Sequence, residues 1–205
     1  LDAFDERDME ARVAAASHAF AARGLAAAVR QSPLCPPGLP AVLERLGWHR
    51  GYETLVMTAN LDDLDLGTGI DHLPTHDIQR FAEACVRIDH ARDTTAAMVA
   101  SIIARIEPAT GLFLMEGASG PTAVGICVQD FDLAGIQQVV VETSARRKGV
   151  GRELVSSALR WARLRGARQA WLQVLADNAS ARRLYDAMGF RTAYSYAYWQ
   201  KEAWA

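Results

Sequence analysis

The chain has 205 residues, with 22 lysines and arginines against 24 aspartates and glutamates, and half of its residues are hydrophobic. This composition is typical of a soluble globular protein with one domain and part of another, or two small ones. A net charge of −2 gives no reason to expect a nucleic-acid partner. The apolar runs are shorter than the ~20 residues that a membrane span needs, and no signal peptide is visible. Three separated cysteines, Cys35, Cys85 and Cys127, favour reduced thiols in a cytoplasmic protein over a disulfide framework or a metal site.

The charge is unevenly distributed along the chain. Residues 146–191 contain 11 lysines and arginines and only three acidic residues, so the rest of the chain is net acidic. Taken alone, any one of these arginines fits a solvated helix face equally well. As a block, these cations indicate a region that meets a small polyanion.

The N-terminal part reads as two helices and a strand. A helix is expected over residues 5–22, with Val13, Ala16 and Phe20 on its apolar face. The proline-rich residues 32–38 form a loop. A short helix follows, whose inward residues are Leu39, Val42, Leu43 and Leu46, and residues 53–59 form a strand. We expect one domain over 1–60, an acidic connector over 61–72, and a second domain over 73–205.

The second domain begins with two amphipathic helices and continues with alternating strands and helices. The helices are marked by Ile78, Phe81, Cys85 and Ile88, and by Met98, Ile102, Ile103 and Ile106. Strands are expected over 112–116, 123–129, 136–142, 171–175 and 194–200. Helices are expected over 150–165 and 179–188. This alternation predicts an α/β fold, with a central mixed sheet flanked by helices.

The sequence also repeats weakly at a separation of 142 residues. This shift places Arg165-Gly166 on Arg23-Gly24, Gly189-Phe190 on Gly47-Trp48, and Tyr194 on Tyr52. The helix, strand, short helix and strand signals then coincide over about fifty residues. The second domain is therefore preceded by a truncated, degenerate copy of the same fold. In that copy Tyr185 is replaced by Leu43, and Asn178 by Pro36.

A basic, glycine-bearing turn connects a predicted strand to a predicted helix. Its sequence is Arg146-Arg147-Lys148-Gly149-Val150-Gly151. Such a turn directs successive backbone N–H groups into one concavity at the positive end of the helix dipole. The spacing predicts a diphosphate cradle, since neither a nucleotide-triphosphate loop nor a dinucleotide fingerprint is present.

A second motif follows 32 residues after Arg146. It reads Asn-x-x-Ala-x-x-Leu-Tyr-x-x-x-Gly-Phe from Asn178 to Phe190. Together, the two motifs resemble the GNAT superfamily of acyl-CoA-dependent N-acyltransferases over about residues 70–205.

The resemblance implies a GNAT-like fold, acetyl-CoA as co-substrate, no metal, and roles for particular residues. Val139, Val140 and Val141 would bond the pantetheine arm through their backbone. The diphosphate would be held by Arg146, Arg147, Lys148, Gly149, Val150, Gly151 and Arg152. Asn178 corresponds to a CoA-contacting asparagine, and Tyr185 to the general acid that protonates the departing thiolate. Both residues also have ordinary interpretations, as a helix cap and as a core aromatic.

The general base is less clearly marked. Some family members carry a glutamate where this chain has Gln173, which cannot act as a base. Glu142 and Asp130 are possible replacements acting through water, and direct loss of the amine proton to solvent is a further alternative. We interpret His72, His76 and His90 as surface or capping residues. One face of the last strand carries three tyrosines, Tyr194, Tyr196 and Tyr198. We expect them either to fill an internal surface or to line the acceptor pocket.

We therefore expect an N-acetyltransferase that moves an acetyl group from acetyl-CoA to a primary amine by direct attack in a ternary complex. A backbone N–H near Val141 would stabilise the oxyanion. The acceptor is a small-molecule or peptide amine, without nucleic acid or membrane partners, and the protein is a monomer or homodimer. The alternative is a non-catalytic acyl-CoA-binding or regulatory module.

Overall fold

The computed structural model describes residues 5–69, 72–89 and 94–201, so His90 lies outside the described residues. Its α-helices are α1 (Met9–Ala21), α2 (Leu39–Arg45), α3 (Ile78–Asp89), α4 (Ala96–Ile103), α5 (Val150–Leu164) and α6 (Ala179–Met188). Its strands are β1 (Ala28–Gln31), β2 (His49–Asn60), β3 (Ala109–Gly117), β4 (Gly120–Asp130), β5 (Leu133–Val141), β6 (Gln169–Leu175) and β7 (Arg191–Gln200). Short 3-10 turns cover Leu61–Asp63 and Thr143–Ala145. Within the described ranges, no helix is both long enough and apolar enough to cross a membrane.

The strands form one mixed sheet in the order β1-β7-β2-β6-β5-β4-β3. β3, β4 and β5 form an antiparallel meander, whereas β5 and β6 run parallel. β1 pairs antiparallel with β7, with Ala28 opposite Gln200 and Gln31 opposite Ala197. The α/β fold class with a mixed central sheet is therefore as predicted.

Contacts divide the chain into two compact units. The smaller unit comprises residues 1–56, 174–179 and 192–205, and the larger unit comprises residues 57–173 and 180–191. These ranges differ from the expected domains of 1–60 and 73–205. The physical reason is strand pairing, because β7 pairs with β1 and so joins the C-terminal residues to the N-terminal ones.

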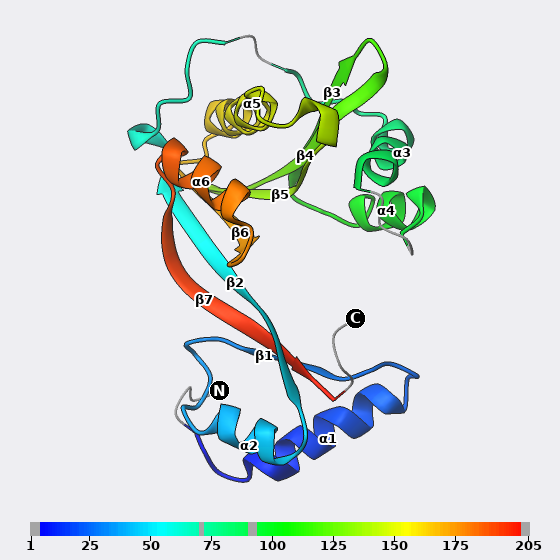
Figure 1. Ribbon diagram of the computed structural model, residues 1–205, viewed down its shortest axis with the longest axis vertical. Helices are drawn as coiled ribbons and strands as arrows, with labels where there is room; N and C mark the ends of the chain where they lie inside the picture. Colours follow the sequence, from blue (N-terminus) through cyan, green and yellow to red (C-terminus); the bar gives the residue numbers. More distant parts are fainter. Residues whose placement is uncertain (1–4, 70–71, 90–93, 202–205) are drawn as a thin grey trace. The chain divides into compact units, whose positions relative to one another are not determined.

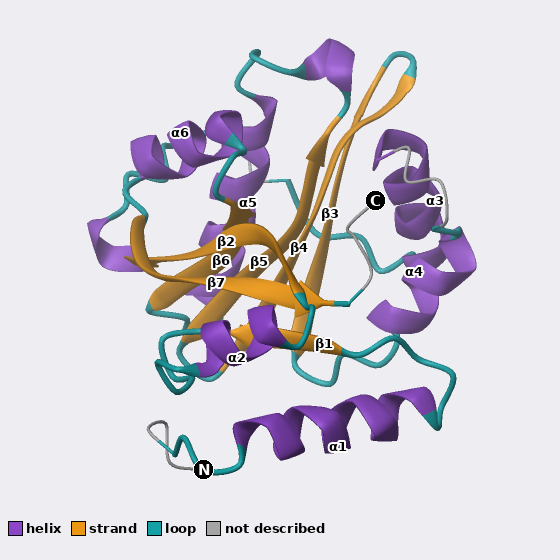
Figure 2. Ribbon diagram, turned by 60° about the horizontal axis from the view of Figure 1, so that its bottom comes forward, coloured by secondary structure: helices purple, strands orange, loops and turns teal. Residues whose placement is uncertain are grey.

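The larger unit has helices on both faces of its strands. α5 and α6 lie on one face, and α3 and α4 lie on the other (Figures 1 and 2). The expected apolar face of α3 is confirmed, since Phe81, Cys85 and Ile88 are buried in the core beneath it. The expected face of α4 is only partly right. Ile103 is buried, but Met98 and Ile102 are 52% and 63% exposed, because this eight-residue helix turns only one narrow side to the core.

The smaller unit has its own core, which lies around α1 and α2. Val13, Leu39, Leu43, Trp48 and Trp199 pack together there. The inward face of α2 is confirmed for Leu39, Val42 and Leu43. The expected face of α1 is wrong for Ala16 and Phe20, which are exposed, since only Val13 of this helix is buried.

The observed elements follow the 142-residue shift. It places α5 on α1, β6 on β1, α6 on α2 and β7 on β2, each within two residues at either end. Gly24 and Gly166, and likewise Gly47 and Gly189, all have positive φ angles. Equivalent chain reversals therefore occur at equivalent positions, although the common origin of the two halves stays a prediction.

Candidate active site

At the C-terminal end of β5, one edge has no strand partner among the described residues. β5 pairs with β6 only from Leu133 to Ile136. Just beyond, a bulge interrupts the β4–β5 ladder: the pairs on either side of it are Ile126 with Gln137 and Val124 with Val140. Gln138, inside the bulge, has a φ angle of +49°. The bulge bends β5 where its pairing with β6 ends.

The backbone of Val141 faces this unpaired edge. The N–H of Glu142 donates to the carbonyl of Thr122 in β4 over 2.8 Å. Since successive peptide groups in a strand alternate sides, the N–H of Val141 points to the opposite edge of β5. Its carbonyl oxygen accepts a bond of 3.0 Å from Nε of Arg146. Val139, Val140 and Val141 therefore lie on a half-buried edge, where one carbonyl is already occupied.

The basic turn forms a concavity lined with backbone donors. Arg147 and Gly149 have φ angles of +59° and +85°, and these left-handed residues reverse the chain into α5. The first bond of the α5 ladder runs from the N–H of Glu153 to the carbonyl of Gly149. Over the described chain, the N–H groups of residues 147–152 have no backbone acceptor. This set of donors at a helix N-terminus fits a diphosphate.

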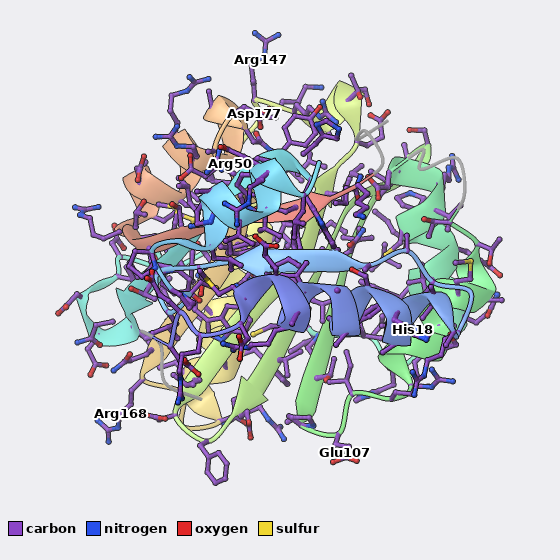
Figure 3. The ribbon with its side chains drawn as sticks, turned by 90° about the horizontal axis from the view of Figure 1, so that it is seen from below. His18, Arg50, Glu107, Arg147, Arg168 and Asp177 are labelled. Atoms are coloured by element: carbon purple, nitrogen blue, oxygen red, sulfur yellow. The ribbon has the colours of Figure 1, made fainter. Side chains whose placement is uncertain are left out.

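The cations of this turn point in different directions. Lys148 is exposed, and the side chain of Arg147 extends away from the ribbon (Figure 3). Arg146 bonds the carbonyl of Val141. Arg152 is turned away from the turn, because its guanidinium donates to the carbonyls of Ala187 and Asp65 over 3.3 and 3.5 Å.

Val150 and Gly151 are the first helical residues of α5, and the two glycines of the turn have different structural roles. Gly149 needs its left-handed angle, and a Cβ there would meet nothing within 4 Å. Gly151 has an ordinary angle. A Cβ there would lie 3.4 Å from Leu184 and 3.4 Å from Val141. Gly151 is therefore not needed for an unusual backbone conformation, and a Cβ there would be in ordinary contact with its neighbours.

Tyr185 is buried in α6, with 6% of its surface exposed. Its ring meets Phe190 edge to face, with the ring centres 5.9 Å apart. Burial raises the pKa of its hydroxyl to about 12. Among the described residues, no group forms a hydrogen bond with this hydroxyl. Its role as an acid stays a prediction.

Asn178 lies directly before α6, where its N–H donates to the carbonyl of Leu175 over 3.0 Å. By its contacts it belongs to the smaller unit, whereas the turn and Tyr185 belong to the larger unit. Asn178 is also engaged in a further interaction. The role of Asn178 toward a cofactor stays a prediction.

The carboxylates considered as bases are poorly suited to that role. Glu142 accepts bonds from the hydroxyl and N–H of Ser144, which hold the pKa of its carboxyl below the usual value. Asp130 pairs with Leu133, at the end of β5 opposite to Val141, and is thus roughly 25 Å away along the strand. Gln173 is exposed, as is His76, while Nε2 of His72 bonds Glu153 over 2.8 Å.

The tyrosines of β7 lie in the smaller unit. Tyr196 is buried and meets Tyr198 edge to face, and the guanidinium of Arg30 lies 3.8 Å above its ring. Tyr194 and Tyr198 are partly exposed. This packing against β1 fits the interpretation as an internal surface.

Sequence reasoning gave no role to Gln138 or Phe190, which shape the site through the bulge and the contact with Tyr185. Phe190 is part of the second motif and could have been found there. Gln138 carries no sequence signal, because glutamine is not typical of a left-handed position.

Residues 76–190 match the model of the family described as Acetyltransferase (GNAT) family. A curated relative, the uncharacterized N-acetyltransferase YobR of Bacillus subtilis (strain 168), is 32% identical over 89 residues. That alignment covers 43% of this chain and 36% of YobR, so the chain spans only about a third of this relative.

Solved structures share the fold at low sequence identity. A GCN5-related N-acetyltransferase from Kribbella flavida has a TM-score of 0.66 at 21% identity, over 91% of this chain and 72% of that protein. A tandem GNAT protein from the clavulanic acid biosynthesis pathway has a TM-score of 0.65 at 17% identity, over 98% of this chain and 72% of that protein. At such identities the likeness establishes the fold alone.

Proposed function

The chain belongs to the GNAT family of acetyltransferases, and on that premise we propose that it transfers an acetyl group from acetyl-CoA to a primary amine by direct attack in a ternary complex. The single observation that carries the proposal is the turn of residues 146–152. Its unbonded N–H groups, with Gly149 at a φ angle of +85°, provide a diphosphate cradle directly beside the unpaired edge of β5.

Different groups of the chain bind different parts of the co-substrate. The donors of the turn and the charge of Arg146, Arg147 and Lys148 hold the diphosphate. The open edge at Val139–Val141 bonds the pantetheine arm, and Asn178 contacts the cofactor. Arg152 contributes its charge from outside the turn, since its N–H groups bond Ala187 and Asp65.

Acetyl-CoA, when bound, supplies an activated acetyl thioester. The neutral amine of the acceptor attacks the thioester carbon, a C–N bond forms, and the C–S bond breaks. The N–H of Val141 stabilises the oxyanion, because it points to the open edge. Tyr185 donates its proton to the thiolate and regains one from solvent.

The amine proton leaves to water rather than to a side chain. Glu142 is held by Ser144 with a lowered pKa, which makes it a poor proton acceptor. Holding amine and thioester together then provides much of the rate by orientation. No cysteine lies in either motif, so we propose no acyl-enzyme.

A panel of small-molecule and peptide amines tests this function, with release of CoA thiol and mass of the acetylated product as readouts. Calorimetry with acetyl-CoA gives the affinity separately. Release that depends on an amine and forms its acetylated product supports the proposal. Binding without release on any amine would instead favour the non-catalytic acyl-CoA-binding module.

A further inference from the structure

A cavity of about 240 Å³ lies between α3 and the hairpin that β3 and β4 form. Its wall on the side of α3 consists of Arg80, Glu83, Ala84 and Arg87, and its wall on the side of the strands consists of Leu114, Glu116 and Pro121. α3 lies beside these strands (Figures 1 and 2). All of the lining residues belong to the larger unit, and neither sequence motif includes any of them.

Arg87 brings a guanidinium group to this cavity. Its Nη2 donates to the carbonyl of Ser119 in the hairpin over 2.9 Å. Gly120 makes this approach possible, because a Cβ at that position would lie only 2.8 Å from the guanidinium. The carbonyl holds the guanidinium in place without neutralising it. Within the described ranges, no carboxylate pairs with Arg87, which therefore keeps its charge for a ligand.

Glu83 brings a carboxylate, one helical turn before Arg87. A glutamate followed four residues later by an arginine commonly forms an ion pair on a helix, but here Arg87 bonds the hairpin instead. Oε1 of Glu83 accepts a bond of 2.8 Å from the neutral amide of Gln79. The two other charged residues of the lining, Arg80 and Glu116, pair with each other. The cavity therefore offers one cation and one anion to a ligand.

These groups fit a small zwitterion. A guanidinium binds a carboxylate through two parallel hydrogen bonds, and the carboxylate of Glu83 can accept bonds from an ammonium group. Leu114 and Pro121 add an apolar surface for a side chain. The cavity is smaller than the ~300–1,000 Å³ of pockets that hold a drug-sized ligand. An α-amino acid with an aliphatic side chain combines the two charges, the apolar group and the small size.

The cavity is separate from the place of the proposed acetyl transfer. In the order β6-β5-β4-β3, β3 lies two strands from the open edge of β5, which is a distance of ~10 Å. Leu114 packs on the core beneath α3, whereas the basic turn leads into α5, on the other face of the sheet (Figures 1 and 2). An ammonium group at Glu83 therefore cannot reach a thioester beside Val141.

We propose that this cavity binds a free α-amino acid with an aliphatic side chain, whose carboxylate pairs with Arg87 and whose ammonium group pairs with Glu83. The amino acid is bound there without being acetylated. The site is thus additional to the proposed function and does not depend on it.

Calorimetry with L-leucine as the probe tests the two charges separately. Leucinamide lacks the carboxylate, and N-acetyl-leucine lacks the ammonium group. The wild type should bind leucine about tenfold more tightly than either analogue, as expected when a charge-assisted hydrogen bond is lost. No binding of leucine, or equal affinity for all three compounds, would overturn the proposal.

Two variants assign the contacts to their residues. Arg87→Met should abolish the preference for leucine over leucinamide and keep the preference over N-acetyl-leucine, whereas Glu83→Gln should do the reverse. The matched control Arg105→Met removes an exposed arginine outside the cavity and should keep both preferences. Thermal melting of each variant reports its folding. If each variant weakens all three compounds by the same factor, the assigned contacts are wrong.

The last test adds leucine to the wild type saturated with acetyl-CoA. Leucine affinity should be unchanged, and mass spectrometry should find no N-acetyl-leucine. Formation of N-acetyl-leucine would refute the separate site, because leucine would then occupy the acceptor site, and it would leave the proposed acetyl transfer intact. Conversely, a protein that binds leucine but not acetyl-CoA would contradict the proposed function alone.

Discussion

Ser195 in β7 donates a hydrogen bond from its hydroxyl to Oε1 of Glu53 in β2 over 2.5 Å, and these two residues are 142 positions apart. This is the separation that relates the two halves of the sequence. In the predicted repeat, these two residues would occupy equivalent positions, and they bond to one another. The strand order β1-β7-β2-β6 is unchanged when equivalent strands are exchanged and the order is reversed. Both observations support the predicted internal repeat.

Replacing Ser195 with alanine should lower the stability of the protein. The substitution leaves the half-buried carboxylate of Glu53 without this donor, and a lost bond to a charged group costs about 1–3 kcal/mol. Thermal melting should show a lower Tm for Ser195→Ala. Ser119→Ala, in an exposed hairpin turn, is the matched control and should melt like the wild type. Equal Tm values for all three proteins would contradict the prediction.

Tyr185→Phe should keep the contact with Phe190 and remove only the acid. We expect kcat to fall by ~10²–10⁴, as for a positioned general acid, with little change in acetyl-CoA affinity. Steady-state kinetics at saturating substrates, combined with calorimetry, separates these effects. If Tyr185 is only a core aromatic, stability falls slightly and kcat is unchanged where chemistry limits the rate.

The raised pKa of Tyr185 predicts that the protein loses stability in alkaline solution. Its folded value is about 12, against an ordinary value near ~10. At a pH below the ordinary pKa, the Tyr185 hydroxyl is protonated in both the folded and the unfolded state, and its contribution to the free energy of unfolding is fully present. This contribution is lost as the pH rises toward 12, because the hydroxyl of the unfolded chain deprotonates first. The free energy of unfolding should therefore fall more steeply over this window in the wild type than in Tyr185→Phe. Chemical denaturation at several pH values measures both slopes, and parallel slopes would argue against the buried phenol.

The two glycines of the turn should respond differently to alanine. Gly149→Ala puts a side chain on a left-handed residue, which costs roughly 1–2 kcal/mol and distorts the cradle. Acetyl-CoA affinity and Tm should both drop. Gly151→Ala has room for its Cβ and improves helix propensity, so its Tm and affinity should stay near the wild type. Calorimetry and melting of the pair give the comparison, and equal effects would refute it.

In the predicted repeat Leu43 aligns with Tyr185, and Leu43 is fully buried. Leu43→Ala should reduce stability by about 2–5 kcal/mol through the cavity it leaves, while acetyl-CoA affinity stays unchanged. Titration of the wild type should give one equivalent of CoA per chain. Two equivalents would show that the N-terminal half retains a cofactor site.

Local patterns predict much of the fold. The apolar faces of α3 and α5 follow from helical periodicity, because each helix packs on the sheet along one broad stripe. The pairing of β1 with β7 does not follow, since β1 has only four residues and its partner is far away in the sequence. The exposure of Phe20 could not be predicted from helical periodicity either. In α1 only Val13 is buried, so the sequence of this helix has little apolar pattern that would indicate its buried face.

The site is predictable where the residue type determines the local backbone conformation. Gly149 marks the left-handed position of the turn. The bulge at Gln138 is not predictable, because no local residue type marks this register shift between β4 and β5. The direction of Arg152 is set by distant carbonyls at Asp65 and Ala187, which no local motif reveals.

The pairing of β1 with β7 also determines when the smaller unit can fold during synthesis. Its registered residues, 28–31 and 197–200, leave the ribosome almost a whole chain length apart. The larger unit, made of residues 57–173 and 180–191, is translated before the last strand is available. The smaller unit can complete its sheet only afterwards, so α1, α2 and β1 remain without their final partner while the larger unit folds.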